Sequence, residues 1–166
     1  MKKNILEIFF FTIFLFSIVF AEEESLVEKQ CNRIGNKLGS VSVEDCLAIR
    51  LSVTDGESSE GAPILIKEYP PLKKREPLGK VLLIGGVHGD EYSSVSIVFK
   101  WLATLNKHHS GLFHWHVIPL LNPDGLLRKE SQRVNGNNVD LNRNFPINDW
   151  ENTAIKYWIE ETGKNP

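Results

Sequence analysis

The stretch LLIGGVHGDEYSSVSIV, from Leu82 to Val98, decides the fold of this chain. Its first residues are apolar and end in glycines, which is typical of a buried strand that breaks into a loop. Apolar residues then return every three or four positions, which predicts an amphipathic helix over Tyr92–Asn106. His88, Asp90 and Glu91 are therefore expected at a strand-to-helix turn.

A further strand is expected after this helix. The segment LFHWHVIPLL, residues 112–121, has the composition of a strand and leads into the turn sequence NPDG. A strand, a helix and a strand in this order imply a parallel crossover and an α/β sheet. Binding sites in such sheets lie beyond the carboxyl ends of the strands, so GGVHGDE and NPDG should border one crevice.

The composition excludes some classes of function. The chain has 166 residues, of which 42% are hydrophobic and 24% charged, and its formal net charge is -2. Nucleic acid is not expected as a partner, because the basic excess that phosphate binding needs is missing. The glycine-rich turn is not a phosphate loop either, since the pattern GxxxxGK[ST] is absent.

The N-terminus predicts export. Lys2 and Lys3 precede an apolar run over residues 8–20, and the sequence turns acidic after Ala21. We expect a signal peptide over residues 1–21 and a periplasmic or secreted protein without stable membrane insertion after cleavage. An uncleaved membrane anchor is the alternative, but a spanning helix usually needs about 20 apolar residues.

Residues 22–61 are expected to form a polar leader before the main domain. It contains the two cysteines, Cys31 and Cys46, which an oxidising compartment would allow to form a disulfide. A metal or redox role is less consistent with the sequence, because no CxxC spacing or nearby histidine accompanies them. The end of the leader, CLAIRLSVTDG, has the composition of a short strand, and APILIKEYPP, residues 62–71, is expected to form the next one.

His88 and Glu91 are the candidate metal ligands. Their HxxE spacing places an imidazole and a carboxylate within one turn of each other, and such a pair is well suited to zinc. Helix capping and solvation are the alternative interpretation of such a pair. A second polar stretch, QRVNGNNVDLNRNFP over Gln132–Pro146, places Arg143 beside Asn142. Such a pair can bind a carboxylate through a guanidinium fork and an amide donor, whereas the alternative is a surface loop with an Asx turn.

In this order and over residues 63–146, the motifs GGVHGDE, NPDG and RVNGNNVDLNRNFP resemble the zinc carboxypeptidases of the M14 family, and within it the bacterial murein peptide amidases. The resemblance implies an α/β fold with a mixed, largely parallel sheet flanked by helices, of which residues 62–166 form the N-terminal part. It also implies that His88 and Glu91 are the first two zinc ligands. Asp140 matches the carboxylate that orients a zinc-bound histidine.

The resemblance further implies a hydrolytic reaction. Asn142 and Arg143 match the pair that binds the terminal carboxylate of the substrate, and Arg133 matches the arginine that polarises the scissile carbonyl. A zinc-bound water would attack a peptide or amide bond. The implied substrate is a peptide with a free carboxylate, such as a cell-wall peptide, which would be cleaved at the bond between γ-D-glutamate and diaminopimelate.

The family's third zinc ligand and its general base, a histidine and a glutamate that come later in the sequence, have no counterpart here. His114 and His116 alternate with Trp115 on the expected strand and are interpreted as flanking the core or packing under the loop. We therefore expect a chain truncated at its C-terminus and inactive on its own. Two alternatives stay open: an N-acyl amino acid deacylase of the aspartoacylase and succinylglutamate desuccinylase type, and a metal-free module that binds peptides.

Overall fold

The computed structural model describes residues 24–145, 152–153, 155–156 and 159–160. The expected signal peptide and Pro146, the last residue of the third motif, lie outside these residues. Within them, no helix has the length and apolar character that crossing a membrane requires.

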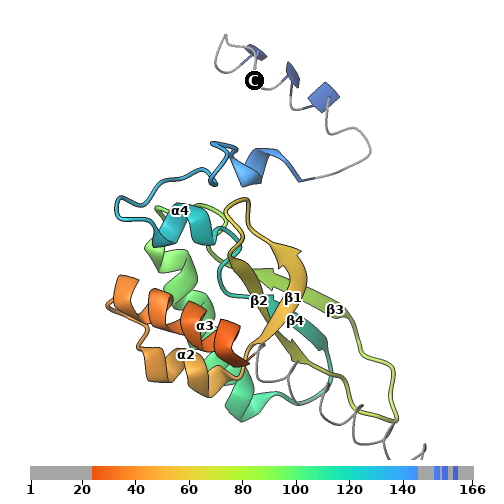
Figure 1. Ribbon diagram of the computed structural model, residues 1–166. Coiled ribbons are helices and arrows are strands. Elements are labelled where there is room, and N and C mark those ends of the chain that lie inside the picture. Colours follow the sequence, from red (N-terminus) through yellow and green to blue (C-terminus); the bar gives the residue numbers. More distant parts are fainter. Residues whose placement is uncertain (1–23, 146–151, 154, 157–158, 161–166) are drawn as a thin grey trace, which may run out of the picture.

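The fold is of the α/β class: a mixed β-sheet has helices packed on one side (Figure 1). Its strands are β1 (Ser52–Glu57), β2 (Pro63–Tyr69), β3 (Lys80–Ile84) and β4 (His114–Ile118), in the order β1-β2-β4-β3. Strands β3 and β4 pair in parallel, whereas β1 with β2 and β2 with β4 pair antiparallel. The α/β class and the mixed sheet are confirmed, and among the described strands the parallel part consists of the pair that the crossover predicts.

Helix α3 (Tyr92–His108) makes the crossover between the two parallel strands. Its buried residues are Val95, Val98, Phe99 and Leu102, which are the apolar stripe expected from the sequence. The ring of Trp101 lies 6.2 Å, centroid to centroid, from that of Trp115 on β4. Because neighbouring residues of a strand point to opposite faces, this contact assigns Trp115 to the helical face of the sheet.

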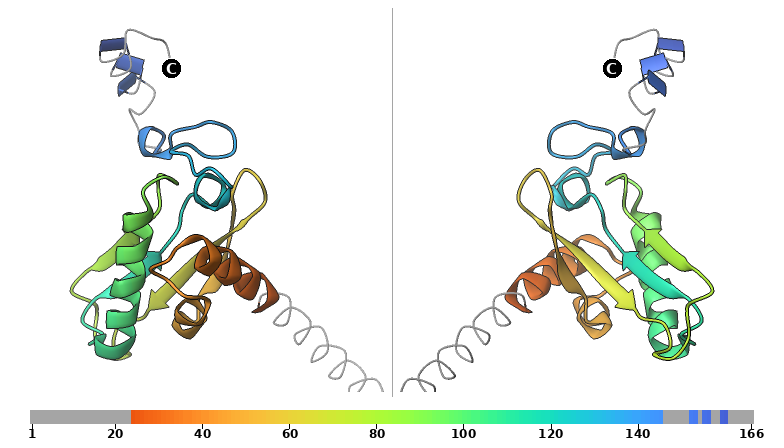
Figure 2. Two further views of the ribbon diagram at one scale, coloured as in Figure 1. Left: turned by 90° about the vertical axis from the view of Figure 1, so that its left-hand side faces the viewer. Right: turned by 90° about the vertical axis from the view of Figure 1, so that its right-hand side faces the viewer.

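The segment expected to be a polar leader is helical. A helix over residues 24–37 and α2 (Val43–Ile49) lie beside α3 on the same side of the sheet (Figure 2). The expected strand in CLAIRLSVTDG is therefore wrong in its first half, and β1 begins only at Ser52. The reason is a capping box that starts α2: the Ser42 hydroxyl accepts from the Asp45 amide at 3.0 Å, and the Asp45 carboxylate accepts from the Ser42 amide at 3.3 Å.

A disulfide between Cys31 and Cys46 joins these two helices, with the Cα atoms 5.5 Å apart. Both cysteines are fully buried. The surrounding apolar residues of the two helices belong to the same core as β2, α3 and β4. The residues before position 62 thus complete the core on which the sheet and α3 rest.

Tyr69 links the sheet to the helical layer. Its hydroxyl is directed toward two acceptors, the Leu102 carbonyl at 3.0 Å and Asn106 Oδ1 at 2.7 Å, both on α3. Burial of the side chain raises the pKa of Tyr69 to about 12, because the charged phenolate would lose its hydration.

The first prediction concerns the disulfide. Replacing both cysteines, as Cys31→Ser with Cys46→Ser, should lower the free energy of unfolding by about 3 kcal/mol, because the unfolded chain is no longer closed into a loop. Urea denaturation under oxidising conditions measures this loss. In a reducing buffer the difference between the unsubstituted chain and the variant should fall to that between buried thiols and buried hydroxyls, and equal midpoints without reductant would contradict the prediction.

The second prediction concerns alkaline pH. An unfolded tyrosine loses its proton near pH 10, whereas the folded Tyr69 holds it to about pH 12. The unfolded state then binds fewer protons, so Tyr69 contributes a stability that is complete below pH 10 and falls as the pH rises. At pH 7 Tyr69→Phe should cost about 1 kcal/mol through the lost hydrogen bonds. At pH 11 the wild-type advantage should be lower by about 1.4 kcal/mol, so that the variant becomes the slightly more stable protein, and a difference independent of pH between 9 and 11 would contradict this account.

Candidate functional site

Three loops meet beyond the carboxyl ends of β3 and β4, as the crossover predicts (Figure 1). The first is the glycine loop over residues 85–91, the second leads into the short helix α4 (Pro123–Leu127), and the third is the polar stretch over residues 132–143. Backbone hydrogen bonds join the loops: the Asn122 amide donates to the Gly86 carbonyl at 2.9 Å and the Gly89 amide to the Arg133 carbonyl at 3.3 Å. The three motifs therefore form one cluster.

Asn122 holds this cluster together. Its side chain is 1% exposed, and its Oδ1 accepts from the Gly125 amide at 2.9 Å, which caps α4. Its Nδ2 donates to the carbonyls of Val87 at 3.3 Å and Arg133 at 3.1 Å. The NPDG sequence, expected as a turn, is therefore the start of a helix, because Asn caps the first turn and Pro fits its first position.

Asp124, two residues further on, ties α4 to the loop between β1 and β2. Its carboxylate accepts from the hydroxyls of Ser58 at 2.5 Å and Ser59 at 2.8 Å, and from the Glu60 amide at 3.2 Å. Burial alone would raise the pKa of Asp124, but these hydrogen bonds lower it below its ordinary value. The sequence interpretation missed this buried anion, and the only signal was an aspartate inside a turn-forming tetrapeptide.

Two glycines of the first loop are explained by the backbone, one by its conformation and the other by a close approach. Gly86 has a φ of +60°, a left-handed conformation that favours glycine. At Gly89 an added Cβ would lie 2.1 Å from the backbone carbonyl carbon of Gly125. The first loop can therefore contact α4 only if position 89 has no side chain.

His88 lies between two carboxylates. Its Nδ1 is 2.9 Å from Glu91 Oε1, and its Nε2 is 3.1 Å from Asp140 Oδ1. The imidazole is 5% exposed, and the Glu91 side chain makes no capping hydrogen bond to α3. Solvation of His88 and capping by Glu91, the alternative interpretation from sequence, are therefore not what the structure has.

The proton count of His88 bears on a metal. A neutral imidazole has a single N–H, so it can donate to Asp140 or to Glu91 but not to both. If Nε2 donates to Asp140, the lone pair of Nδ1 faces a carboxylate oxygen at 2.9 Å. The contact between Nδ1 and Oε1 is then favourable only with a second proton or a cation between these atoms. A nitrogen and an oxygen that converge in this way fit two ligands of zinc.

Arg133 closes the cluster on its open side. Its Nε donates to Asp140 Oδ2 at 2.9 Å, and its Nη1 lies 3.5 Å from Glu91 Oε1. Burial opposes ionisation of Asp140, but hydrogen bonds from Arg133, His88 and the Asn142 amide hold the pKa of its carboxyl below the usual range. Asp140 is therefore an anion at neutral pH, as an acceptor for His88 must be.

The remaining two predicted residues lie on the short 3-10 helix η1 (Leu141–Arg143). Asp140 caps it by accepting from the Asn142 amide at 2.9 Å, so the Asx turn of the alternative interpretation is present. The Asn142 residue is exposed, and Arg143 Nη1 donates to the Asn142 carbonyl at 3.3 Å. The structure thus brings His88, Glu91, Arg133 and Asp140 into contact and places Asn142 and Arg143 directly after Asp140.

Comparison with known proteins gives matches to one group of hydrolases. Residues 77–163 match the family described as "Succinylglutamate desuccinylase/Aspartoacylase catalytic domain". Murein peptide amidase A of Escherichia coli (strain K12) is 37% identical over 102 residues, which cover 61% of this chain and 38% of the amidase. Carboxypeptidase SOL1 of Arabidopsis thaliana is 37% identical over 140 residues, covering 70% of this chain and 28% of that protein.

A solved structure supports the fold. The metallo-carboxypeptidase from Burkholderia cenocepacia superposes with a TM-score of 0.53 and 23% identity, over 72% of this chain and 36% of the enzyme. The likeness to metallocarboxypeptidases that the three motifs predicted is confirmed. The chain spans 38% of the length of murein peptide amidase A of Escherichia coli and 28% of that of carboxypeptidase SOL1.

The third prediction tests the contact between the first loop and α4. Gly89→Ala should lower the free energy of unfolding by about 3 kcal/mol or more, because its methyl group would overlap backbone that cannot move aside. Gly39→Ala is the matched control, since no atom lies within 4 Å of the added Cβ. Its effect should stay within about 0.5 kcal/mol. Equal thermal unfolding midpoints for the two variants would contradict the described packing.

Proposed function

The chain belongs to the succinylglutamate desuccinylase/aspartoacylase catalytic-domain family, and from this we propose that the protein is a zinc-dependent hydrolase that cleaves an amide bond next to a free carboxylate. The observation that carries the proposal is the convergence of His88 Nδ1 and Glu91 Oε1 at 2.9 Å, with Nε2 of the same imidazole bound to Asp140. This arrangement leaves one nitrogen and one oxygen directed at a common point.

His88 and Glu91 would hold the zinc, and Asp140 would fix the imidazole so that Nδ1 faces the metal. When bound, zinc supplies a water of lowered pKa and a Lewis acid for the carbonyl. Within the described residues, no third histidine or carboxylate completes a metal site with this pair. Arg133 is half exposed and reaches the rim of the cluster, where its guanidinium would stabilise the developing oxyanion.

Asn142 and Arg143 would bind the free carboxylate of the substrate. A guanidinium binds a carboxylate through two parallel hydrogen bonds, and a neighbouring amide adds a third donor. Holding one end of the substrate fixes the distance to the scissile bond, so that a terminal residue is presented to the metal. Because η1 follows Asp140 directly, the carboxylate site and the metal site would share one rigid support.

We propose a cell-wall peptide as the substrate and the periplasm as the site of action. The 37% identity to a murein peptide amidase supports the substrate class. The Cys31–Cys46 disulfide supports export, because such bonds persist in oxidising compartments. The change from apolar to acidic residues after Ala21 supports cleavage of a signal peptide there.

A second candidate function is the removal of an acyl group from an N-acyl amino acid. The family match over residues 77–163 favours it, because the family is described by two such deacylases. The identity to a murein peptide amidase and to a carboxypeptidase favours the peptide. Both reactions use the same metal and a substrate carboxylate, so only turnover distinguishes them.

The fourth prediction separates these functions. The full-length protein should hydrolyse a cell-wall tripeptide ending in diaminopimelate faster than N-succinylglutamate, and a chelator should abolish both rates. Glu91→Gln should lower kcat/KM by at least about 100-fold, since even residues that only orient a ligand contribute 10–100-fold. Arg143→Ala should raise KM by roughly 10-fold or more through the lost charged hydrogen bonds, whereas Arg75→Ala, in an exposed loop, should not.

Each alternative has its own outcome. Faster turnover of N-succinylglutamate would replace the peptidase by the deacylase. Peptide binding that is unaffected by chelator and by Glu91→Gln, with no turnover of either compound, would overturn the hydrolase in favour of a peptide-binding module.

A further inference from the structure

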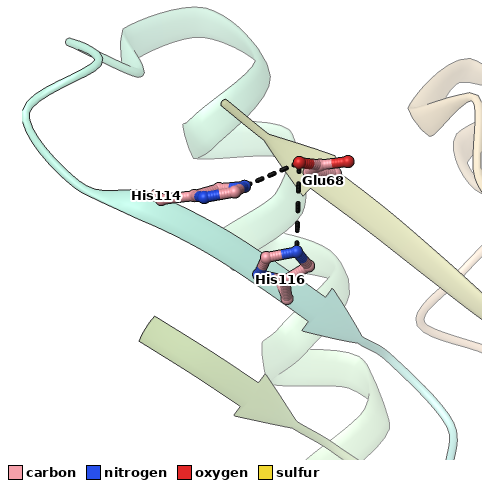
Figure 3. A group of neighbouring side chains, drawn as sticks. All are labelled: Glu68, His114 and His116. Atoms are coloured by element: carbon pink, nitrogen blue, oxygen red, sulfur yellow. Dashed lines mark hydrogen bonds and ion pairs between the residues drawn. The ribbon is translucent and has the colours of Figure 1, made fainter. Parts of the chain in front are cut away.

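A second group of metal-ligating side chains lies on the face of the sheet opposite α3. It consists of Glu68 on β2 and His114 and His116 on β4 (Figure 3). The sequence interpretation had the two histidines flanking the core or packing under the loop. Packing under the loop is wrong, because His114 and His116 are the first and third residues of β4, whereas the loop cluster follows the strand's carboxyl end.

Strand geometry places the three side chains together. His114 and His116 are two residues apart on one strand, so both point away from the face that Trp115 shares with α3. Glu68 is directly opposite His116 in the antiparallel pair of β2 with β4. Directly opposite residues of such a pair project on the same side, which brings the carboxylate onto the two imidazoles.

The ligand atoms are close enough to share one ion. Glu68 Oε1 lies 2.6 Å from His114 Nε2 and 3.9 Å from His116 Nε2, and the two rings are 4.4 Å apart, centroid to centroid. Ligands at about 2.0–2.2 Å from a tetrahedral ion are roughly 3.3–3.6 Å from each other. The observed distances lie on both sides of this value, so small side-chain rotations suffice to enclose an ion.

The donor set selects the class of ion. Two imidazoles and one carboxylate suit zinc, copper or nickel, whereas calcium and magnesium require oxygen ligands. The side chains of His114 and His116 are 19% and 37% exposed, and that of Glu68 is 55% exposed, so an ion can enter from solvent. Solvent would occupy the remaining coordination positions.

We propose that Glu68, His114 and His116 form a second site for a divalent transition-metal ion, separate from the His88 and Glu91 pair. Both strands are inside the sheet and are fixed by their neighbours β1 and β3. The three donors are therefore held on a rigid support, and a bound ion links β2 to β4. Binding to the folded chain alone would raise the stability of the fold by mass action.

The fifth prediction uses the full chain, without a histidine tag, titrated with Cu2+ or with Zn2+. In the background His88→Gln with Glu91→Gln, which removes the other pair, we expect one equivalent of Cu2+ with an electron paramagnetic resonance spectrum that shows two nitrogen ligands. Zn2+ should raise the thermal unfolding midpoint. His116→Gln should weaken binding by at least about 10-fold and leave one nitrogen ligand, since loss of a ligand exceeds loss of an orienting partner.

Two further variants make the result decisive. Glu68→Gln keeps the shape of an exposed side chain and removes the anionic ligand, so it should weaken binding without altering the far-ultraviolet circular dichroism spectrum. His108→Gln is the matched control, because this histidine is exposed at the end of α3, and it should change nothing. Absence of binding in the doubly substituted background, or binding that survives His114→Gln with His116→Gln, would overturn the proposal.

Discussion

The rest of the site depends on the hydrogen bonds that the buried carboxamide of Asn122 makes. Its three hydrogen bonds join the start of α4 to the polar stretch that follows it and to the glycine loop, which lies 35 residues earlier. A buried amide left without partners is costly, so the three segments must adopt these positions together. The absence of a side chain at Gly89 then allows the backbones to touch, and His88, its neighbour, is carried to Asp140.

Charge balance gives the second constraint. The carboxylates of Glu91 and Asp140 each contact both the imidazole of His88 and the guanidinium of Arg133. The guanidinium is permanently charged and holds Asp140 ionised. Glu91, which is half exposed, is the more weakly held anion and the one that can turn toward a cation. Within the cluster, Asp140 therefore orients the imidazole, and the more exposed Glu91 is available to bind.

The parts of the structure that sequence predicts are those with a local pattern. The β3–α3–β4 unit follows from apolar periodicity, and the contact of Asp140 with His88 follows from the resemblance of the motifs. Helix α2 departs from the predicted strand because the capping box SVED starts a helix just before a segment of strand-like composition. The cluster of Glu68 with the two histidines has no local signal, since it depends on the register between strands 46 residues apart.

Strand β4 connects the two metal-binding arrangements. Its parallel pairing with β3 makes both strands end at the same edge, which is why the loops that follow them share the His88 cluster. Its antiparallel pairing with β2 brings a residue from late in β2 beside the first half of β4, where the histidines are. Because β4 takes part in both pairings, the direction of each neighbouring strand decides which part of β4 lies next to that neighbour's functional residues. Reversing either pairing would separate the corresponding ligands, so the mixed character of the sheet is what allows two separate sites.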